Sequence, residues 1–512
     1  MASWRPVIGL EIHAQISSLS KLFSPASTAF MQRPNSQVTL FDAATPGTLP
    51  RANVACVDAA IATSLALGCR VNERSFFDRK HYFYRDSPLG YQITQKDVPI
   101  GESGELRVRD GAVAVGIERV QLETDTGKTV AEVDRASGFD GIMDRSEVYR
   151  APGGDDELAA AGRARARTGV ALLDLNRAGV GLMEIVTTPS LTSAEDAGAF
   201  LRALQFLLQH IGACDGNMEE GSLRCDVNVS VSRDGSATGQ RCEVKNLNSV
   251  RGVMRAIEFE TQRQIALLEA GGTVEAETRA FDAATSETRR MRGKDTAIDY
   301  RFMRDPNLPP LVVSPDHIDA VRASLPEMPD EMRRRLRDAY GLDEYTVGVL
   351  IDAGAVAFYE AAMAASQCGD GKRMSNWLTS ELLGRLSGLQ TLATSPVDAA
   401  RLAQLVDLVA EGTISGKIGK QVLDVLFAHD AASPVPFPLA VVDEHGWRNV
   451  TDVGELEAQV DALLASMPDK IAEYRAGKEK LFGFFVGQMM KVTRGQANPQ
   501  ALNDVLRARL KG

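Results

Sequence analysis

Two short runs of alternating apolar and charged residues, far apart in the chain, place the strongest constraint on its fold. Residues 7–13 (VIGLEIH) and 218–226 (MEEGSLRCD) both read as strands that carry carboxylates. Because a strand points alternate side chains to one face, Glu11 and His13 are expected to project together. Acids and an imidazole that converge on one sheet face suit a hard divalent cation and the phosphates that it carries. The pattern predicts a metal site on a sheet, and with it nucleotide-driven chemistry.

The first 300 residues alternate short β-like runs with turns marked by Gly and Pro. Apolar residues at helical spacing predict helices over residues 51–67, 193–211 and 251–270, and a strand is predicted over 240–246. Residues 134–168 are rich in Gly, Ala, Asp and Arg and have no steady period, which is typical of a surface excursion. This part of the chain is predicted to be α+β.

From residue 330 onward the sequence signals are almost wholly helical. Short amphipathic segments are predicted over residues 376–387, 397–411 and 417–427, each bounded by Gly, Pro or Ser. Residues 431–438 (AASPVPFP) are the clearest linker in the chain. Helices with a basic end follow this linker.

Length and composition exclude several classes of protein. A chain of 512 residues with 44% hydrophobic residues has room for two to four domains with real cores. It has no apolar run near the roughly 20 residues that span a bilayer, so no membrane association is expected. Its six cysteines form no Cys-x-x-Cys pair, so neither a disulfide framework nor a thiolate zinc site is expected. The N-terminus leads directly into a strand, which favours a cytoplasmic protein, with the mitochondrial matrix as the alternative.

The charge of the chain is unevenly distributed. The net charge is −11, but residues 470–512 hold nine Lys or Arg against three Asp or Glu, a balance of +6. The preceding 469 residues therefore carry −17. An acidic body with a basic tail is typical of a module that meets a polyanion. On charge alone, a solvated helical surface is the favoured interpretation.

Residues 78–86 (DRKHYFYRD) combine cations with aromatic and imidazole rings. Arg79 and Lys80 could hold phosphates, while Tyr82 or Tyr84 could stack a base or a ribose. An ordinary strand with a charged rim explains the same residues equally well.

Residues 122–128 (LETDTGK) place Glu123 and Asp125 two positions apart, so on a strand both would share a face and could bind Mg²⁺. The segment Gly127-Lys128 resembles the end of a P-loop. That motif needs a Gly five residues before Gly127, at position 122, which is Leu here, so a P-loop is rejected. Taken alone, this segment is best interpreted as a charged hairpin edge.

Two further segments could bind anions. Arg177 ends the segment DLNR, residues 174–177, and precedes two glycines and Glu184. Residues 245–249 (KNLNS) open a predicted helix, whose N-terminus favours an anion. Taken singly, this segment is better explained as a helix capped by its own Asn and Ser.

Some residues are assigned no chemistry at this stage. Cys225 lies in a predicted strand without a paired His, so a small buried hydrophobe is expected there. His210 ends an apolar helix face and is expected to be structural. Arg301 and Arg304 could face a polyanion or stay in local ion pairs, and the sequence does not decide between these. No Gly-x-Ser-x-Gly motif is present to support an acyl-enzyme nucleophile.

Taken in order, these motifs resemble the GatB family, the B subunits of tRNA-dependent amidotransferases. The resemblance covers nearly the whole chain, including each end separately. The matching runs are residues 7–13, 77–84 (FDRKHYFY), 90–95 (GYQITQ), 174–177, 218–226, 245–249, 483–488 (GFFVGQ) and 495–499 (GQANP).

The resemblance implies a fold and a reaction. It implies a cradle-like α+β catalytic domain at residues 1–300, a connecting segment and helical domain at 301–430, and a helical tail related to the YqeY proteins at 431–512. The implied reaction is ATP- and Mg²⁺-dependent amidation of Glu-tRNA(Gln), Asp-tRNA(Asn) or both, in which the side-chain carboxylate is first phosphorylated. Ammonia would come from the amidase of the same complex, its A subunit, and the complex would also hold a small third subunit, known as the C subunit.

The resemblance also implies roles for individual residues. Many relatives carry a second acid at the position of Thr124, so the site is expected to be less acidic or differently liganded here. Gly483 and Gly487 are expected to let helices of the tail pack closely. The implied catalytic residues are Glu11, His13, Glu123 and Glu220, and the implied metal ligands are these four with Asp125 and Glu184, and Asp226 behind them. The candidates for ATP, phosphate or the acceptor end are Arg79, Lys80, Tyr82, Tyr84, Arg177, Arg224, Lys245 and Asn246. The candidates for tRNA binding in the tail are Lys478, Lys480, Lys491 and Arg494.

Two other classes of function use the same residues. The chain could be an RNA-binding scaffold whose carboxylates form structural ion pairs, and it would then support no ATP hydrolysis that depends on misacylated tRNA. It could instead be a metal-dependent nuclease, which would cleave RNA without ATP. The nuclease ranks last.

Overall fold

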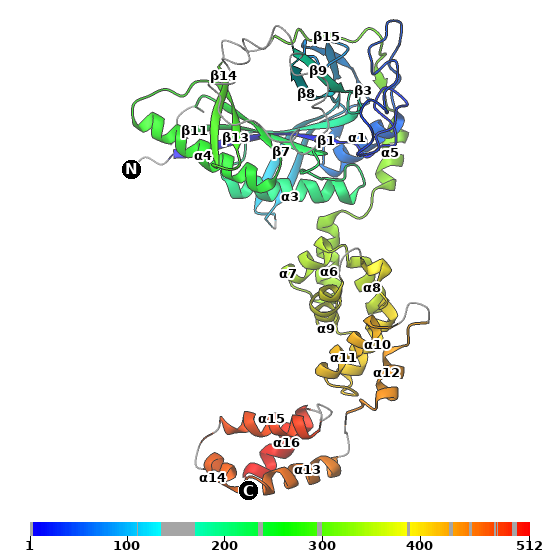
Figure 1. The fold of residues 1–512 in the computed structure, drawn as a ribbon, viewed down its shortest axis with the longest axis vertical. Helices are drawn as coiled ribbons and strands as arrows, with labels where there is room; N and C mark the ends of the chain where they lie inside the picture. The colour runs from blue at the N-terminus through cyan, green and yellow to red at the C-terminus, as the bar shows by residue number, and fades with distance from the viewer. Residues whose placement is uncertain are drawn as a thin grey trace. The chain divides into compact units, whose positions relative to one another are not determined.

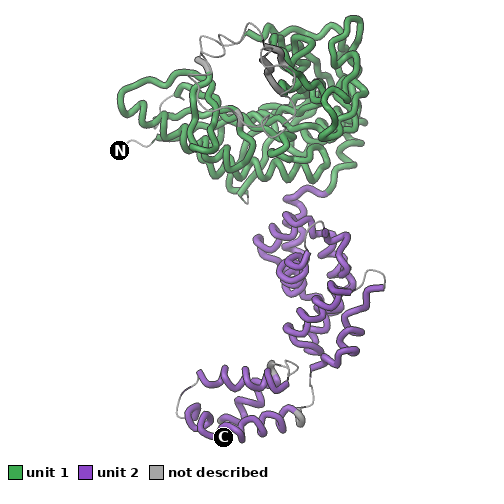
Figure 2. Tube along the Cα trace, in the orientation of Figure 1, with its two compact units in different colours: residues 1–326 green, residues 327–512 purple. Residues whose placement is uncertain are grey.

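The computed structural model of the chain describes residues 4–109, 111–134, 169–233, 239–293, 299–386, 390–429, 434–449, 453–475, 478, 480–493 and 499–511. The chain divides into two compact units, residues 1–326 and residues 327–512 (Figure 2). Their helices and strands are labelled in Figure 1. Each unit is described by itself below.

Nine of the described strands form one sheet in the first unit. Their order is β14-β13-β12-β11-β1-β10-β7-β6-β2, and every neighbouring pair is antiparallel except β12 with β13. The first strand of the chain therefore lies in the middle of the sheet. The strands are β1 (Trp4–Gln15), β2 (Arg70–Val71), β6 (Gly101–Val108), β7 (Val113–Thr124), β10 (Gly181–Thr187), β11 (Leu223–Arg233), β12 (Cys242–Leu247), β13 (Glu277–Asp282) and β14 (Glu287–Gly293).

Helices cover one face of this sheet. The helices α3 (Ala194–His210) and α4 (Val250–Glu269) pack on each other, and α4 packs on β11 (Figure 1). Each begins at a serine that accepts a hydrogen bond from a backbone N–H three residues on, Ser193 in α3 and Ser249 in α4. In β1, Ile8, Leu10 and Ile12 are buried while Gly9 and Glu11 between them are less so, which is the alternation of a sheet with one covered face. The other face carries Glu11 and His13 of β1.

Three small sheets complete the first unit. One of them, β15-β4-β5, pairs Met303 with Arg79 and so brings the chain near residue 300 back to the segment near residue 80. These sheets are formed by β15 (Met303–Arg304), β4 (Asp78–His81) and β5 (Tyr91–Thr94), by β16 (Leu311–Val312) and β3 (Arg74–Ser75), and by β8 (Lys128–Asp134) and β9 (Gly169–Asp174). The other helices in the described part of this unit are α1 (Val54–Ala66) and α5 (Pro315–Ser324).

The second unit is helical throughout its described ranges. A π-helix, Trp377–Leu382, follows α9 and continues as a 3-10 turn, Leu383–Arg385. The C-terminal helices share a core centred on Phe485 and Met489. The helices are α6 (Pro329–Tyr340), α7 (Glu344–Asp352), α8 (Val356–Ala365), α9 (Gly371–Asn376), a 3-10 turn (Leu392–Thr394), α10 (Ala399–Ala410), α11 (Gly416–Phe427), α12 (Pro438–His445), α13 (Val453–Ala465), α14 (Pro468–Arg475), α15 (Leu481–Val492) and α16 (Pro499–Lys511).

The architecture confirms the prediction of an α+β part followed by a helical part. The helices predicted over residues 51–67, 193–211 and 251–270 are α1, α3 and α4, and those over 397–411 and 417–427 are α10 and α11. The segment predicted at 376–387 begins earlier, at Gly371, and is not an α-helix over most of its length. Residues 135–168 of the predicted surface excursion lie outside the described residues, as do residues 431–433 of the predicted linker.

Within the described ranges, no single helix is long and apolar enough to cross a membrane. Only the pair α7 and α8, bent by 112° between its members, passes that test jointly. All six cysteines lie in described segments and are free thiols; five are buried and Cys368 is exposed.

Candidate active site

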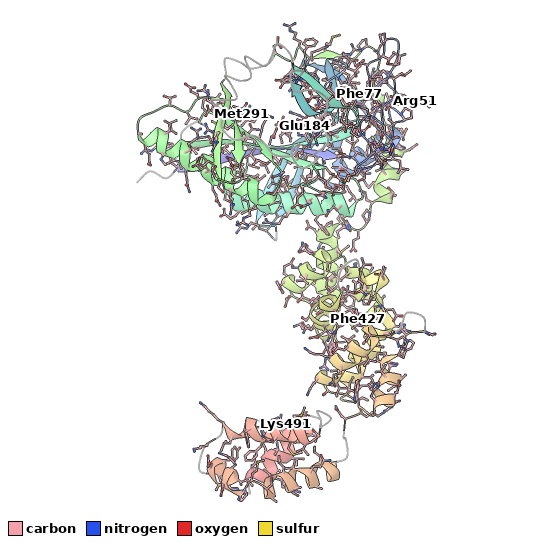
Figure 3. All side chains as sticks on the ribbon, viewed as in Figure 1. Arg51, Phe77, Glu184, Met291, Phe427 and Lys491 are labelled. Carbon is pink, nitrogen blue, oxygen red and sulfur yellow. The ribbon has the colours of Figure 1, made fainter. Side chains whose placement is uncertain are left out.

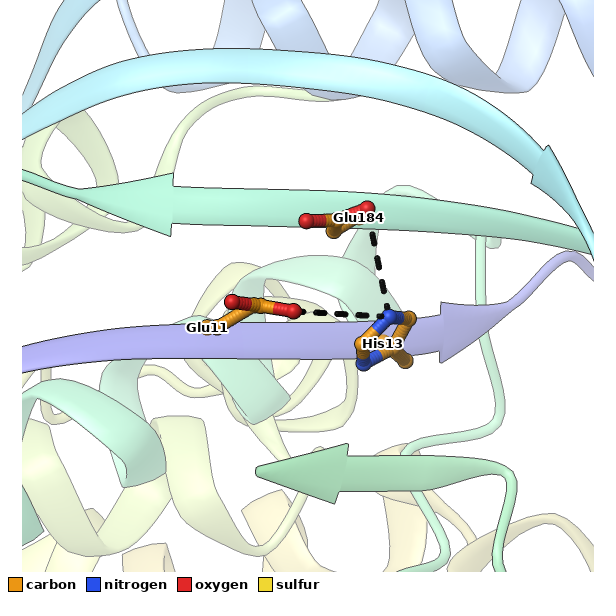
Figure 4. Close-up of side chains that lie close together, drawn as sticks. All are labelled: Glu11, His13 and Glu184. Atoms are coloured by element: carbon orange, nitrogen blue, oxygen red, sulfur yellow. Dashed lines mark ion pairs between the residues drawn. The ribbon is translucent and has the colours of Figure 1, made fainter. Parts of the chain in front are cut away.

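Two neighbouring strands bring two carboxylates and an imidazole together on the open face of the sheet. His13 on β1 lies directly opposite Glu184 on β10, and Glu11 lies two residues before His13. His13 Nε2 is 4.0 Å from Glu11 Oε1 and 3.9 Å from Glu184 Oε2, and the three side chains point toward one another (Figure 4). One ligand atom from each falls within 4.8 Å of the others. We call Glu11, His13 and Glu184 the acid–imidazole cluster. In Figure 3, Glu184 lies toward the middle of the first unit.

The strand registers explain why this face is polar. The pairing places Gln121 of β7, Glu184 of β10, His13 of β1 and Arg224 of β11 in one row across four strands. Residues directly opposite in an antiparallel pair share a face, so all four side chains project to the same side. Gln121 donates a hydrogen bond of 2.6 Å to Glu184 Oε2 and holds that carboxylate in place.

The electrostatics of the cluster favour a bound cation. Burial raises the pKa of Glu11 to about 7, and the charge of Glu184 adds to the effect. The pKa of Glu184 is likewise raised to about 7 by burial, with the charge of Glu123 next in importance. Both carboxylates therefore resist ionisation where they stand. A divalent cation between them would remove that penalty.

A cavity of about 590 Å³ opens beside the cluster. Glu11 and His13 reach its wall, whereas Glu184 is buried behind them. Its size is within the range of small-molecule and cofactor sites. The cavity is lined by Glu11, His13, Lys80, Tyr82, Gln92, Glu123, Asp125, Thr126, Leu182, Met218, Glu219, Glu220, Gly221, Arg224, Cys225, Asp226, Lys245, Leu247 and Asn248.

Glu123 and Lys80 form a buried pair on one wall of the cavity. Lys80 Nζ is 3.6 Å from Glu123 Oε2, and Glu123 Oε1 accepts a hydrogen bond of 3.2 Å from Gln92. The Glu123 side chain is only 2% exposed, yet Oε2 has no hydrogen-bond partner among the described residues. Burial opposes the charge of Lys80, but the carboxylates of Glu123 and Glu184 outweigh it and raise the Lys80 pKa above its usual value. A buried acceptor without a partner is costly and is typical of a site that binds a ligand.

The other two cations of the wall are also paired with acids. Arg224 donates a hydrogen bond of 2.7 Å to Asp125, and Lys245 Nζ lies 2.6 Å from Asp226 and 2.9 Å from Glu243. Burial opposes the charge of Lys245, but Asp226 and Glu243 together raise its pKa. Six carboxylates line the cavity against three Lys or Arg side chains. The lining is therefore net acidic.

Most of the residues predicted for the site meet in this cavity. The structure brings together Glu11, His13, Glu123, Asp125, Glu220, Lys80, Tyr82, Arg224 and Lys245, with Glu184 directly behind the wall. The side chain of Asn246 lies outside the described residues, although its neighbour Asn248 lines the cavity.

Two local predictions are wrong, although the residues still reach the cavity. Glu220 was expected in a strand-like run, but it is exposed in a turn that precedes β11, because Gly221 adopts a φ of 83° and ends the turn. Asp125 was expected to share a strand with Glu123. The strand β7 ends at Thr124, and Asp125 instead exchanges backbone hydrogen bonds with Gly179 and Val180.

Three predicted ligand-binding residues lie outside the cavity lining. Arg79 binds the buried Asp305 through a hydrogen bond of 2.9 Å and stacks on the Tyr91 ring. Arg177 donates to the backbone carbonyls of Thr126 and Gly127, and so orders that loop. The ring of Tyr84 is exposed.

Three further predictions can be compared with the structure. Ser249 caps α4, as the simpler interpretation of residues 245–249 required. Cys225 is buried, and its burial raises its pKa well above the usual range, so it is not a thiolate. Arg304 is held by Asp78 at 3.0 Å, which favours the local ion pair over a free cation.

The basic residues predicted in the tail belong to the second unit. Lys480 and Lys491 are exposed at either end of α15, and Lys478 pairs with Glu473 at 3.1 Å. Arg494 lies outside the described residues. Gly483 and Gly487 are exposed, and a Cβ at either position would meet nothing within 4 Å, so the expectation that they allow close helix packing is wrong for the described part of the chain.

Sequence reasoning missed three features near the site. The ring of Tyr300 lies under Lys80 Nζ at 5.4 Å, and Gln92 and Gln121 hold the buried carboxylates. Lys21 and Asp42 form a fully buried ion pair at 3.3 Å, and Lys21 reaches the carbonyl of Leu175, next to the loop that carries Arg177. Only the Gln residues had a sequence signal, since each stands in a strand-like run beside a predicted site residue.

Comparison with known proteins agrees with this geometry. The sequence profile of the GatB/GatE catalytic domain matches residues 6–319, and that of the GatB domain matches residues 357–510. The chain is 46% identical over 514 residues to the B subunit of the aspartyl/glutamyl-tRNA(Asn/Gln) amidotransferase of Nitrobacter hamburgensis, with 99% of this chain and 96% of the relative covered. It is 46% identical over 512 residues to the same subunit of Methylobacterium radiotolerans, with the same shares covered, and 45% identical over 512 residues to that of Granulibacter bethesdensis, of which 98% is covered. With its catalytic-domain profile matched over most of its length and the acid–imidazole cluster inside the matched part, the chain belongs to the GatB/GatE family.

Proposed function

We propose that this chain is the B subunit of a tRNA-dependent amidotransferase. It converts glutamate on tRNA(Gln), aspartate on tRNA(Asn), or both, into the amide, and the reaction consumes ATP. The observation that carries this proposal is the acid–imidazole cluster beside a polar cavity, within the region that matches the GatB/GatE catalytic domain.

The donor set fits a divalent cation such as Mg²⁺. Ligands about 2.1 Å from Mg²⁺ stand about 3 Å apart along an octahedral edge, while in the structure His13 Nε2 lies 4.0 Å from Glu11 Oε1 and 3.9 Å from Glu184 Oε2. The side chains need to close by about an ångström. Mg²⁺ prefers oxygen, so Glu11 and Glu184 would hold it most strongly and His13 would complete or border the site. When bound, the cation neutralises phosphate charge and polarises a phosphoryl oxygen.

The charge of the cavity accounts for the need for such a cation. A nucleoside triphosphate is a polyanion, and a net acidic lining would repel it. Lys80, Arg224 and Lys245 offset part of that repulsion and could orient phosphate oxygens. Because each of these three already pairs with a carboxylate, phosphate binding requires the pairs to rearrange or a cation to enter.

The chemistry explains why ATP is needed. A carboxylate is a poor acyl donor, and phosphorylation of the side chain supplies a leaving group that ammonia can displace. The attacking nitrogen must lose a proton, and Glu123 Oε2, buried and without a hydrogen-bond partner in the described structure, is the acceptor that we assign to it. Lys80 Nζ lies 3.6 Å from this oxygen and offsets the negative charge of the carboxylate.

We assign the supply of ammonia to another polypeptide. The thiol of Cys225 is buried and its pKa is raised, so it does not provide a glutaminase nucleophile. The names of the relatives denote one subunit of a larger enzyme, and the partners proposed here are the amidase, or A subunit, together with the small C subunit. Lys478, Lys480, Lys491 and Arg494 are proposed to meet the tRNA body. The relatives compared above are bacterial, which favours the cytoplasm.

One assay tests the proposal. The purified complex is incubated with glutamine, Mg²⁺ and each misacylated tRNA, with and without ATP, and the amino acid on the tRNA is identified. Amide formation that requires both ATP and the misacylated tRNA is expected. Amidation that proceeds normally without this chain would make it a scaffold, and RNA cleavage without ATP would make it a nuclease.

A further inference from the structure

We propose that four aromatic rings, one of which lines the cavity, form a stacking platform for unstacked nucleobases at the single-stranded acceptor end of tRNA. The rings belong to Tyr84, Tyr82, Tyr300 and Phe302, and we call them the aromatic row. The proposal rests on the proposed function, because it concerns how that substrate is presented to the cavity.

The four rings form a continuous series. The ring centroids of Tyr82 and Tyr84 are 5.3 Å apart, those of Tyr82 and Tyr300 are 6.4 Å apart, and those of Tyr300 and Phe302 are 5.9 Å apart. These separations are typical of interacting aromatic pairs. The row therefore joins two segments of the chain that are more than 200 residues apart in the sequence.

The backbone fixes this juxtaposition. The strand β15 pairs with β4 just beyond the row, and the N–H of His81 donates a hydrogen bond of 2.8 Å to the carbonyl of Tyr300. His81 Nδ1 also lies 2.9 Å from the carbonyl of Arg301. Arg301 adopts a φ of 44°, a left-handed conformation that is uncommon for a residue other than glycine. The rings on either side of it, Tyr300 and Phe302, are thus held by the fold.

All four rings of the row are at least partly exposed to solvent, unlike the aromatic rings of a hydrophobic core. The side chain of Phe302 is 41% exposed and that of Tyr84 is 54% exposed, while Tyr82 and Tyr300 are half-buried. Exposed aromatic faces in a row are the usual means by which proteins bind single-stranded nucleic acid without reading its sequence.

Two lysine side chains lie close to rings of the aromatic row, and one of them, Lys80, also lines the cavity. Lys80 Nζ lies 5.4 Å from the ring centroid of Tyr300, and Lys96 Nζ lies 5.6 Å from that of Phe302. Lys96 thus places a positive charge beside a stacking surface, which suits bases joined by a phosphate backbone, while the charge of Lys80 is shared with Glu123.

The position of the row indicates which nucleic acid it binds. Tyr82 lines the cavity together with Lys80, whereas the other three rings lie outside the lining. Tyr84 and Tyr300 adjoin Tyr82, and Phe302 adjoins Tyr300. An amino acid esterified to the last nucleotide must enter the cavity, and the bases just before that ester would then pass over the rings. The adenine of one ATP molecule covers one ring face, or two at most, whereas four rings offer room for successive bases.

The test compares two forms of tRNA(Gln), one with a complete 3′ end and one that lacks the last three nucleotides. Their binding to the full chain is measured for the wild type, for the double variant Tyr300→Leu/Phe302→Leu, and for Tyr300→Phe, which keeps the ring. Phe30→Leu is the matched control, because Phe30 is an exposed ring of the same unit outside the row. ATP binding is measured for each variant, and circular dichroism checks its fold.

The wild type, Tyr300→Phe and Phe30→Leu should bind the truncated tRNA about tenfold more weakly than the complete one, or more weakly still. The double variant should bind both forms equally within about twofold, with ATP binding unchanged. A double variant that kept the wild-type loss on truncation would overturn the proposal. Weaker ATP binding with unchanged tRNA binding would also overturn it, and would assign the rings to the nucleotide. This comparison measures binding and needs no catalysis. If the complex failed to amidate tRNA but truncation of the tRNA still weakened binding as expected, only the proposed function would be refuted.

Discussion

At the residue scale, Glu11 and Glu184 favour a bound cation but lower the stability of the metal-free protein when they are ionised. Both carboxylates have a pKa raised from 4.5 to about 7, chiefly by burial. A group whose folded-state pKa is raised contributes stability that is present below the unfolded pKa and lost as the pH rises through the folded pKa. Between pH 4.5 and 7, the metal-free first unit should therefore lose stability as these groups ionise.

This predicts a pH-dependent effect of Glu184→Gln. In the presence of a chelator the variant should be more stable than the wild type at pH 8, by about 1 kcal/mol. At pH 5 the difference should vanish, because the wild-type carboxyl is then protonated as well. Thermal unfolding of the full chain at the two pH values measures it. Excess Mg²⁺ or Mn²⁺ should stabilise the wild type at pH 8 and have much less effect on the variant. An equal difference at both pH values would show that Glu184 is not the group that titrates.

Cys225 gives a second residue-scale prediction. Because its thiol is buried and its pKa is raised, Cys225→Ala should leave amidation by the assembled complex within about twofold of the wild type. The isolated chain should hydrolyse no glutamine, although it could accept ammonium salts as a nitrogen source. Glutamine hydrolysis by the isolated wild-type chain, abolished in Cys225→Ala, would contradict the assignment of ammonia supply to a partner.

The site could be predicted from the sequence only where local periodicity determines it. Strand alternation placed Glu11 and His13 on one face, and the structure agrees. The position of Glu184 opposite His13 depends on a register between strands about 170 residues apart, which alternation within one strand does not determine. The same holds for Tyr300, whose place beside Lys80 follows from the pairing of β15 with β4.

At the scale of elements, prediction succeeded where caps and periodicity agreed. The helices α3 and α4 combine an apolar stripe with a serine cap, and both were placed to within a few residues. Prediction failed at residues 219–220. There the Asn217 side chain accepts hydrogen bonds from the backbone N–H groups of Glu219 and Glu220, and the chain forms a turn. Asn217 and Gly221 favour a turn by their own conformational preferences. The prediction overlooked them, because it interpreted Glu219 and Glu220 as part of a strand.

The helix α15 supplies a prediction about its glycines. Gly483 and Gly487 are exposed inside the helix, and a Cβ at either would meet nothing within 4 Å. Because glycine is a poor helix former, Gly487→Ala should stabilise α15 by about 0.5–1 kcal/mol. Hydrogen exchange of the α15 amides in the full chain measures this.

Gly419→Ala is the matched control for that substitution. Gly419 lies in α11, where a Cβ would stand 2.6 Å from the Trp377 ring, so alanine there should destabilise its helix. Destabilisation of α15 by Gly487→Ala would indicate that this face of the helix has a neighbour.

At the scale of the whole molecule, the charge division of the chain predicts separate roles for body and tail. The +6 balance of residues 470–512 stands on helices beyond a Pro-rich segment, and these helices have a core of their own. Deletion from residue 431 onward should raise the KM for misacylated tRNA at least about tenfold while ATP binding and association with the amidase persist.

A point variant tests the role of the tail through the salt dependence of tRNA affinity. Lys491→Gln should reduce the slope of log affinity for tRNA against log salt concentration by about one. Lys417→Gln, an exposed lysine of α11, is the control and should leave the slope unchanged. Truncated protein that bound tRNA as tightly as the full chain at the same salt would make the tail purely structural.

The central claim is that ATP is used at the acid–imidazole cluster. Its most direct test is the rate of ATP hydrolysis that depends on misacylated tRNA, measured on complexes assembled with the wild-type chain, with Glu184→Gln and with Glu105→Gln. Glu105 is an exposed acid of β6, outside the cavity, that pairs with Arg107. Glu184→Gln is expected to lower this rate at least about a hundredfold, because the cation loses a charged ligand. Glutamine hydrolysis by the amidase partner should persist, and Glu105→Gln should match the wild type. A Glu184→Gln complex that hydrolysed ATP within about twofold of the wild-type rate would show that ATP is not used at the acid–imidazole cluster.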